Sequence, residues 1–333
     1  MRHSTVYGPV PSWRFGRSLG IDVITPPKKC TFDCLYCQLG RTKIHVSELE
    51  MIREPLASVN KVLADLEDVL KRIDLTTVDI VTFSGTGEPT LNPKLGEIAD
   101  EVKNRISGLP MAILTNSSLF YRDDVRRNLS RFSMVVAKLD AGDDETFKLI
   151  NRPADKKLDI ETIVESIKKL KGEIKGLLAL EVMLLRTENG EVTNIKGKPL
   201  RNLIDTILDV NPDIVQLEVP YRPPSESFVK SPSQSQIEIV LKELSETFGK
   251  EKLWVYGKHD RRRKHVMWLR HESLEKEVLT LLERRPCRAV DISFSLGIDL
   301  FTAQRLLKTL EKNCQLSVKV INEEKFYFKK TDT

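Results

Sequence analysis

Short apolar runs rich in Val, Ile and Leu recur along residues 20–256. Such runs are typical of parallel strands buried on both faces of a sheet. In the segments between them, apolar residues recur with a period of about 3.6, which predicts amphipathic helices. The expected helices are Pro55–Ile73, Pro93–Ile106, Ile160–Leu170 and Gln234–Phe248. The expected strands are Ile21–Thr25, Val78–Phe83, Met111–Thr115, Met134–Leu139, Leu177–Leu185, Ile214–Val219 and Leu253–Tyr256.

The repeated order of strand and then helix predicts an α/β fold with a parallel sheet or barrel. In such folds ligands gather at the carboxyl ends of the strands, so we judge each motif by whether it follows a strand. The length of 333 residues favours one large domain and a smaller one.

The pattern changes after a basic stretch, Lys258–His265, which we interpret as part of a linker over residues 258–270. The large domain then covers residues 1–257. Residues 271–333 resemble a winged-helix domain, with three short helices and a hairpin. Its helices are expected at Glu272–Arg285, Val290–Leu296 and Leu300–Lys312, and its strands at Gln315–Ile321 and Lys325–Lys330, joined around Asn322, Glu323 and Glu324.

The composition is that of a soluble globular protein, with 40% hydrophobic and 30% charged residues. No apolar run reaches the length of about 18 residues that a transmembrane helix needs, and the N-terminus has no apolar signal region. We therefore expect a cytoplasmic protein. From Lys258 onward, 17 Lys and Arg face 11 Asp and Glu, a net charge of +6. This basic C-terminal region is compatible with binding of nucleic acid and equally with a surface that only keeps the protein in solution.

Three of the five cysteines, Cys30, Cys34 and Cys37, crowd into eight residues with the spacing C-x3-C-x2-C. This crowding indicates metal binding in a reducing compartment rather than a disulfide framework. Iron–sulfur clusters usually take four cysteines, so three would leave one metal position open, as in catalytic sites. The alternatives are a zinc site and three buried structural cysteines. We expect Cys287 and Cys314 to be small buried hydrophobes.

A glycine-rich segment, Ser84–Thr90, follows the expected strand Val78–Phe83. Its glycines allow close approach of the backbone to a ligand, and Glu88 can accept hydrogen bonds from an ammonium group. A dinucleotide-binding loop is the alternative, but Pro89 and the missing third glycine argue against it. Further polar residues at or near the ends of expected strands are Thr115, Asn116, Ser117, Lys138, Asp140, Asp143, Glu181, Arg186, Gln216, Glu218, Tyr221 and Arg222.

For these strand-end residues the alternative roles are helix caps, turns and surface charges. Asp143, just before Glu145, suits a helix cap especially well. Arg14 and Arg17, which precede the first expected strand, either bind an anionic substrate or anchor the N-terminal segment.

The cysteine spacing, with Tyr36 just before the last cysteine, resembles the signature loop of the radical S-adenosylmethionine (SAM) superfamily. The stretch Tyr7–Asp22 resembles a branch related to the wyosine-forming tRNA enzymes. The resemblance covers residues from about 7 to 256. It implies an incomplete (β/α)6 TIM-like barrel over residues 1–257.

The resemblance also implies a reaction. A [4Fe–4S] cluster on Cys30, Cys34 and Cys37 would chelate SAM through its open iron. One electron, delivered by a flavodoxin or ferredoxin, would cleave SAM to methionine and a 5′-deoxyadenosyl radical, which abstracts hydrogen from the substrate. The cofactor-binding residues implied are Gly85, Thr86, Gly87 and Glu88 in the SAM pocket, Tyr36 behind the adenine, Thr115 and Asn116 at a strand end, Asp140 at the ribose, and Lys138 and Arg186 at a carboxylate.

The sequence leaves the substrate and the oligomeric state open. RNA modification and protein or peptide modification are the favoured classes. The wyosine-forming enzymes carry further N-terminal cysteines for a second cluster, whereas no cysteine precedes Cys30, so their activity is not transferred. The alternative function is an iron–sulfur DNA-binding or redox-sensing regulator. Its recognition helix would be Leu300–Lys312, with Gln304, Arg305 and Lys308 as contacts.

Overall fold

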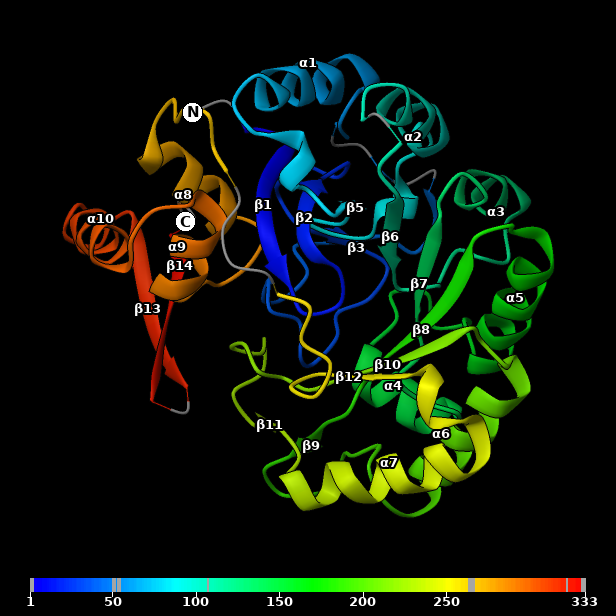
Figure 1. Ribbon diagram of the computed structural model, residues 1–333. Helices are drawn as coiled ribbons and strands as arrows, with labels where there is room; N and C mark the ends of the chain where they lie inside the picture. The colour runs from blue at the N-terminus through cyan, green and yellow to red at the C-terminus, as the bar shows by residue number, and fades with distance from the viewer. Residues whose placement is uncertain are drawn as a thin grey trace.

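The computed structural model describes residues 3–49, 52, 55–106, 108–262, 267–321 and 323–330. In this part of the chain, the largest sheet has eight strands and curls into a half-barrel (Figure 1). All its strands are parallel except β1, which pairs antiparallel with β2 at one edge. In spatial order the strands are β1 (Val6–Ser12), β2 (Gly16–Ile21), β5 (Ile80–Phe83), β6 (Met111–Thr115), β7 (Met134–Lys138), β8 (Leu177–Met183), β10 (Ile214–Glu218) and β12 (Leu253–Val255).

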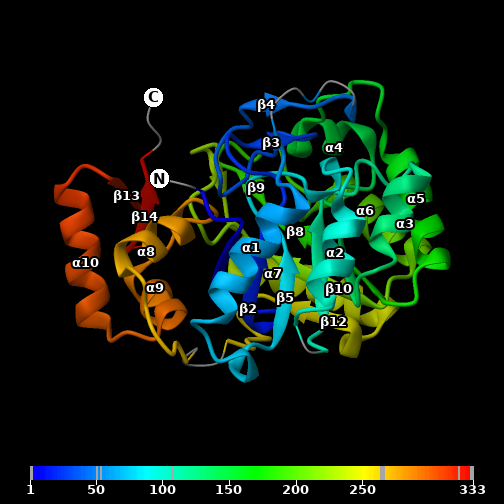
Figure 2. The same ribbon diagram turned by 90° about the horizontal axis from the view of Figure 1, so that it is seen from above.

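Helices cover the outer face of this sheet (Figures 1 and 2). Each presents an apolar stripe inward; α1, for example, buries Val62, Leu66 and Val69, spaced three or four residues apart. The predicted cap Asp143 begins α4, where its carboxylate accepts a hydrogen bond from the Thr146 amide at 2.8 Å. The helices are α1 (Val59–Leu70), α2 (Leu95–Lys103), α3 (Asp123–Leu129), α4 (Asp144–Asn151), α5 (Ile160–Glu173), α6 (Gly197–Val210) and α7 (Gln234–Phe248), with short 3-10 turns η2 (Leu75–Thr77), η3 (Pro89–Leu91) and η4 (Lys250–Lys252).

The prediction of the first strand was wrong. Only Ile21 of the run at 21–25 belongs to a strand, as the last residue of β2. The chain turns at Thr25, whose φ is 66°. The sheet instead takes β2, which pairs with β5 and follows β1 through a reversal at Gly16. Polar Ser18 is tolerated inside because its hydroxyl lies 2.7 Å from that of Thr82.

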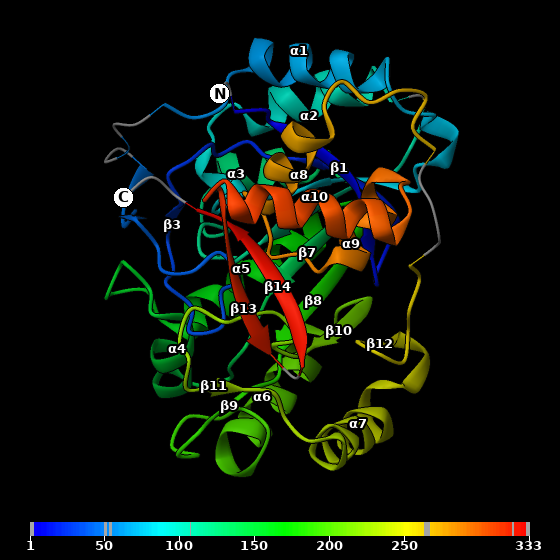
Figure 3. The ribbon, with the colours of Figure 1, turned by 90° about the vertical axis from the view of Figure 1, so that its left-hand side faces the viewer.

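Three helices and a hairpin form a C-terminal unit beside β1 (Figures 1 and 3). Their apolar residues, such as Val278, Ile292 and Leu307, share one core with Tyr7 and Val10 of β1. This packing covers the edge of the sheet, which would otherwise present unpaired backbone groups. The elements are α8 (Leu274–Leu282), α9 (Ala289–Leu296), α10 (Leu300–Lys312), β13 (Leu316–Ile321) and β14 (Glu324–Lys329).

The two remaining cysteines differ in exposure. Cys287 is buried as predicted, but Cys314 is exposed, so that prediction was wrong. Cys314 follows α10 with a φ of 58°, in the turn that leads to β13, and this turn faces solvent.

Both described stretches of the segment predicted as a linker, 258–262 and 267–270, are hydrogen-bonded to the barrel. The Arg261 amide donates to the Trp13 carbonyl at 2.9 Å, and the Leu269 amide donates to Arg72 at 2.8 Å. Arg263, Lys264 and His265 of the basic stretch, like Asn322 of the hairpin turn, lie outside the described residues. Among the described helices, none has the length and apolar character of a membrane span.

Candidate functional site

The three clustered cysteines line one cavity of about 260 Å³. Cys30 ends the short strand β3 (Lys29–Cys30), which pairs with β4 (Ile44–His45), and Cys34 and Cys37 lie in the loop that follows Cys30. All three thiols are free of disulfides. Much of the remaining wall comes from the carboxyl ends of the parallel strands, where ligands bind in α/β folds. These strand-end residues include Ser84, Thr115, Lys138, Met183 and Glu218.

Nitrogen donors surround the three sulfur atoms. The Lys28 ammonium donates to Cys37 Sγ at 3.1 Å. Asn116 and Asn151 donate their side-chain amides to Cys30 Sγ and Cys34 Sγ, each at 3.5 Å. Hydrogen bonds of this kind stabilise thiolates and tune the potential of an iron–sulfur cluster.

The donor set fits a cluster better than a single ion. In the described part of the chain, no group of three or more His, Cys, Asp or Glu side chains converges to hold one metal ion. A cluster instead distributes its cysteines over several irons. Burial raises the pKa of both Cys30 and Cys34 to about 12, so both thiols stay protonated until a metal provides positive charge. Binding of a metal or cluster to these thiols would therefore release protons.

The glycines after β5 are needed for two close contacts. A Cβ on Gly87 would lie 1.9 Å from the carbonyl oxygen of Lys29, and one on Gly85 would lie 2.2 Å from Cγ of Asp22. The Glu88 amide donates to the same Lys29 carbonyl at 3.1 Å. Gly87 thus lets this loop lie directly against β3, which ends at Cys30, and Gly85 leaves room for the side chain of Asp22. Both glycines line the cavity.

Glu88 joins the ends of β5 and β6. Its Oε1 accepts hydrogen bonds from the Thr90 hydroxyl and the Thr115 hydroxyl, each at 2.6 Å, and its Oε2 accepts one from the Asn116 amide at 2.7 Å. Burial is the largest influence on this carboxyl and raises its pKa. Glu88 lines the cavity, and Oε2 keeps acceptor capacity for a ligand ammonium.

Tyr36 and Asp140 form a buried pair beside the cysteine loop. The Tyr36 hydroxyl donates to Asp140, which also accepts from Asn151 at 2.7 Å and from the Met183 amide at 2.8 Å. Tyr36 lines the cavity, but Asp140 does not. Because protein donors occupy its carboxylate, Asp140 positions Tyr36 rather than facing a ribose.

Two other predicted residues lie away from the cavity wall. The Thr86 hydroxyl donates to Asp22 at 2.9 Å and is turned from the cavity. Arg186 is on β9 (Arg186–Thr187), which pairs with β11 (Val229–Lys230), so it lines surface pockets elsewhere. The structure therefore does not bring Arg186 to a cofactor carboxylate at this cavity.

Lys138 belongs to a charged network on the cavity wall. Its ammonium donates to Glu181 at 2.6 Å, and Arg14 reaches both Glu181 and Glu218, the latter at 2.6 Å. Burial would raise the pKa of Glu181, but the charges of Arg14 and Lys138 lower it to about 2. The network therefore holds Glu181 ionised and fixes Lys138 in place.

Sequence reasoning missed some residues that contact the thiols. Lys28 lies only two residues before Cys30, and this closeness in sequence could have indicated that it contacts the thiols. Asn151 carried no signal, because it is the last residue of α4 and reaches Cys34 only through the tertiary fold.

The model of the family described as "Radical SAM superfamily" matches residues 24–194. The chain is 33% identical over 282 residues to "UPF0026 protein MJ1312" of Methanocaldococcus jannaschii, covering 85% of this chain and 83% of that protein. It is 30% identical over 322 residues to a "UPF0026 protein" of Helicobacter pylori, covering 97% and 96%. The crystal structure of Streptococcus suis SuiB bound to S-adenosylmethionine is a distant likeness, with 14% identity, a TM-score of 0.47, and coverage of 72% of this chain and 50% of that one.

Proposed function

Because this chain belongs to the radical SAM superfamily, we propose that it is an enzyme that cleaves SAM reductively at a [4Fe–4S] cluster held by Cys30, Cys34 and Cys37. The observation that carries the proposal is the shared cavity. Three thiols with nitrogen donors on their sulfur atoms line it together with the glycine-rich loop. The bound cluster and SAM together supply a 5′-deoxyadenosyl radical, which abstracts hydrogen from the substrate.

The chain's own groups bind and orient SAM. Glu88 Oε2, which already accepts from the Asn116 amide, would accept from the SAM ammonium, and Lys138, fixed by Glu181, would pair with its carboxylate. The ring of Tyr36 backs the adenine, held by the bond from its hydroxyl to Asp140. Apolar residues on the wall, such as Leu114 and Val136, exclude water that would quench a radical.

The test is to reconstitute the protein without oxygen, add dithionite and SAM, and detect 5′-deoxyadenosine by mass spectrometry. We expect product from the parent and from Cys314→Ala, whose thiol is exposed and remote from the cavity wall. We expect none from Cys34→Ala. A protein that holds its cluster but never makes 5′-deoxyadenosine with any reductant or candidate substrate would contradict the proposal.

We assign the C-terminal unit to the winged-helix-like class, because three helices precede its hairpin. RNA modification and protein or peptide modification are the substrate classes we favour, and an external flavodoxin or ferredoxin is the electron donor. RNA would bind mainly through phosphates, so its affinity would fall steeply with salt. Affinity for RNA that does not change with salt would count against that class.

A further inference from the structure

A second cavity, of about 150 Å³, adjoins the cysteine cavity. It lies where the N-terminal hairpin, the segment after β10 and the C-terminal unit meet. Arg14, Gln38, Tyr221 and Arg222 line both cavities. A molecule held in the second cavity would therefore reach the place where the radical forms.

Of the residues that the structure describes, six arginines line this second cavity, and four of these are paired with carboxylates. Arg284 lies 3.2 Å from Asp22, and Arg288 lies 3.1 Å from Asp291, the acidic residue on the wall of this cavity. The other paired arginines are Arg14, with Glu181 and Glu218, and Arg262, with Asp260.

Arg285 and Arg222 are the exceptions. Among the described residues, neither has a carboxylate within 4.0 Å, and each has a buried Nε atom without a hydrogen-bond partner. Arg285 is only 8% exposed. Arg222 donates one hydrogen bond, to Gln38 Oε1 at 2.8 Å. The charge of Asp291 acts on both arginines, but its carboxylate is bound to Arg288. The Nε donors of Arg222 and Arg285 therefore stay available for an anionic ligand.

We propose that Arg222 and Arg285 bind the phosphate group of a phosphate monoester substrate. Guanidinium groups bind phosphate with paired hydrogen bonds, and a phosphate monoester carries about two negative charges at neutral pH. Among the described residues, neither guanidinium group has a carboxylate within 4.0 Å, so the two together can offset that charge. The binding site stands on its own geometry, whereas its identification as a substrate site rests on the proposed function.

The surrounding aromatic residues fix the position of Arg222. Its guanidinium carbon lies 4.5 Å from the ring centre of Tyr221. Tyr221 in turn stacks on Tyr256, with ring centres 4.2 Å apart and planes 14° from parallel. Arg222 is thereby preorganised for a ligand, and less entropy is lost on binding.

The two arginines come from different parts of the fold. Arg222 follows β10 of the barrel, whereas Arg285 follows α8 of the C-terminal unit. Removing the C-terminal unit would therefore remove half of the anion site. This unit completes the substrate cavity in addition to any docking role.

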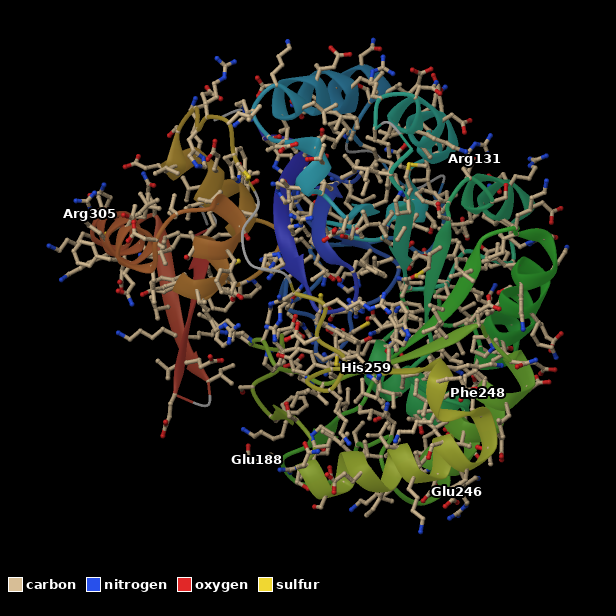
Figure 4. All side chains as sticks on the ribbon, viewed as in Figure 1. Arg131, Glu188, Glu246, Phe248, His259 and Arg305 are labelled. Carbon is tan, nitrogen blue, oxygen red and sulfur yellow. The ribbon has the colours of Figure 1, made fainter. Side chains whose placement is uncertain are left out.

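The proposal is tested by calorimetric titration of the reconstituted holoenzyme with inorganic phosphate, without SAM and at constant ionic strength. We expect Arg285→Gln and Arg222→Gln each to weaken binding about tenfold or more. Arg285→Lys, which keeps the charge but loses the planar fork, should weaken binding less. The control is Arg305→Gln on the outer side of α10, which should bind within about twofold of the parent (Figure 4).

Titration with dimethyl phosphate distinguishes a monoester from a diester, because this compound mimics a phosphodiester and carries only one negative charge. We expect it to bind at least tenfold more weakly than phosphate; equal or tighter binding would overturn the monoester assignment. Absence of phosphate binding, or equal binding by the parent and the Arg222 and Arg285 variants, would overturn the site. Should Arg285→Gln fail to fold, Arg222→Gln carries the test. Phosphate binding without any SAM cleavage would contradict only the proposed function.

Discussion

At the residue scale, Gly87 shows how one missing side chain shapes the cavity. Its backbone lies so close to β3 that the Lys29 carbonyl occupies the space of a Cβ. The adjacent Glu88 amide uses that same carbonyl as its acceptor. The loop that would contact SAM and the strand that ends at Cys30 are therefore fixed against each other.

We predict that Gly87→Ala lowers the free energy of unfolding by about 2 kcal/mol, because the added methyl group overpacks a rigid backbone contact. The iron content after reconstitution should fall as well, since β3 must move. Both effects are measured by chemical denaturation and by iron analysis.

Gly172→Ala is the matched control. Gly172 lies in α5, and a Cβ there would meet nothing within 4 Å. The alanine should stabilise the helix by up to about 1 kcal/mol and leave the iron content unchanged. Equal behaviour of the two alanine variants would refute the account of Gly87.

Local spacing made part of the site predictable. The three cysteines and the glycine-rich loop are contiguous motifs, so the sequence alone drew attention to them. Asp140 and Arg186 were harder, because strand-end position does not specify the direction of a side chain. The Asp140 carboxylate accepts hydrogen bonds from the Tyr36 hydroxyl and the Met183 amide, and Arg186 lies on a small separate sheet.

At the element scale, buried charges join the C-terminal unit to the barrel. Asp22, which follows β2, pairs with Arg284 after α8, and both side chains are at most 1% exposed. Asp22 also accepts from Thr86 in the glycine-rich loop. One carboxylate thus connects the C-terminal unit to the loop beside the cysteines.

We predict that Asp22→Asn destabilises the protein by about 3 kcal/mol, because it leaves the buried Arg284 charge with less compensation. The control is Asp68→Asn, which breaks the pair between Asp68 on α1 and Arg72 just beyond that helix; the Asp68 side chain is 59% exposed. That change should cost less than about 1 kcal/mol. Denaturation midpoints compare the two variants, and equal midpoints would contradict a structural role for Asp22.

The predictable elements were those with a continuous apolar run or with apolar residues at a period of about 3.6. The run at 111–115 became β6, and Gln234–Phe248 became α7. The N-terminal hairpin was missed because β2 carries glycine and polar residues, such as Ser18, that are satisfied only by partners across the sheet. Such partners cannot be read from a local pattern.

At the scale of the whole molecule, buried carboxylates determine the stability in acid. The pKa values of Asp22, Glu181, Glu283 and Asp291 are each lowered to about 2, because neighbouring cations and donors outweigh the effect of burial. In the unfolded chain these groups titrate near pH 4. Their contribution to the free energy of unfolding is therefore complete above about pH 4 and is lost as the pH falls toward 2.

We predict a steep loss of stability between pH 4 and pH 2, measured as denaturation midpoints across that range. Asp22 alone should account for about 2 kcal/mol of this loss of stability. The stability of the Asp22→Asn variant should therefore fall less steeply with pH than that of the parent. A parent and variant with the same pH dependence would show that Asp22 is not held ionised by its partners.

The central claim is that three cysteines hold a cluster whose open iron binds SAM in the shared cavity. The most direct test is the electron paramagnetic resonance spectrum of the dithionite-reduced, reconstituted protein, recorded before and after addition of SAM. The account predicts a cluster signal that SAM shifts in the parent and that is lost in Cys34→Ala. A strong cluster signal that SAM leaves unchanged would contradict it.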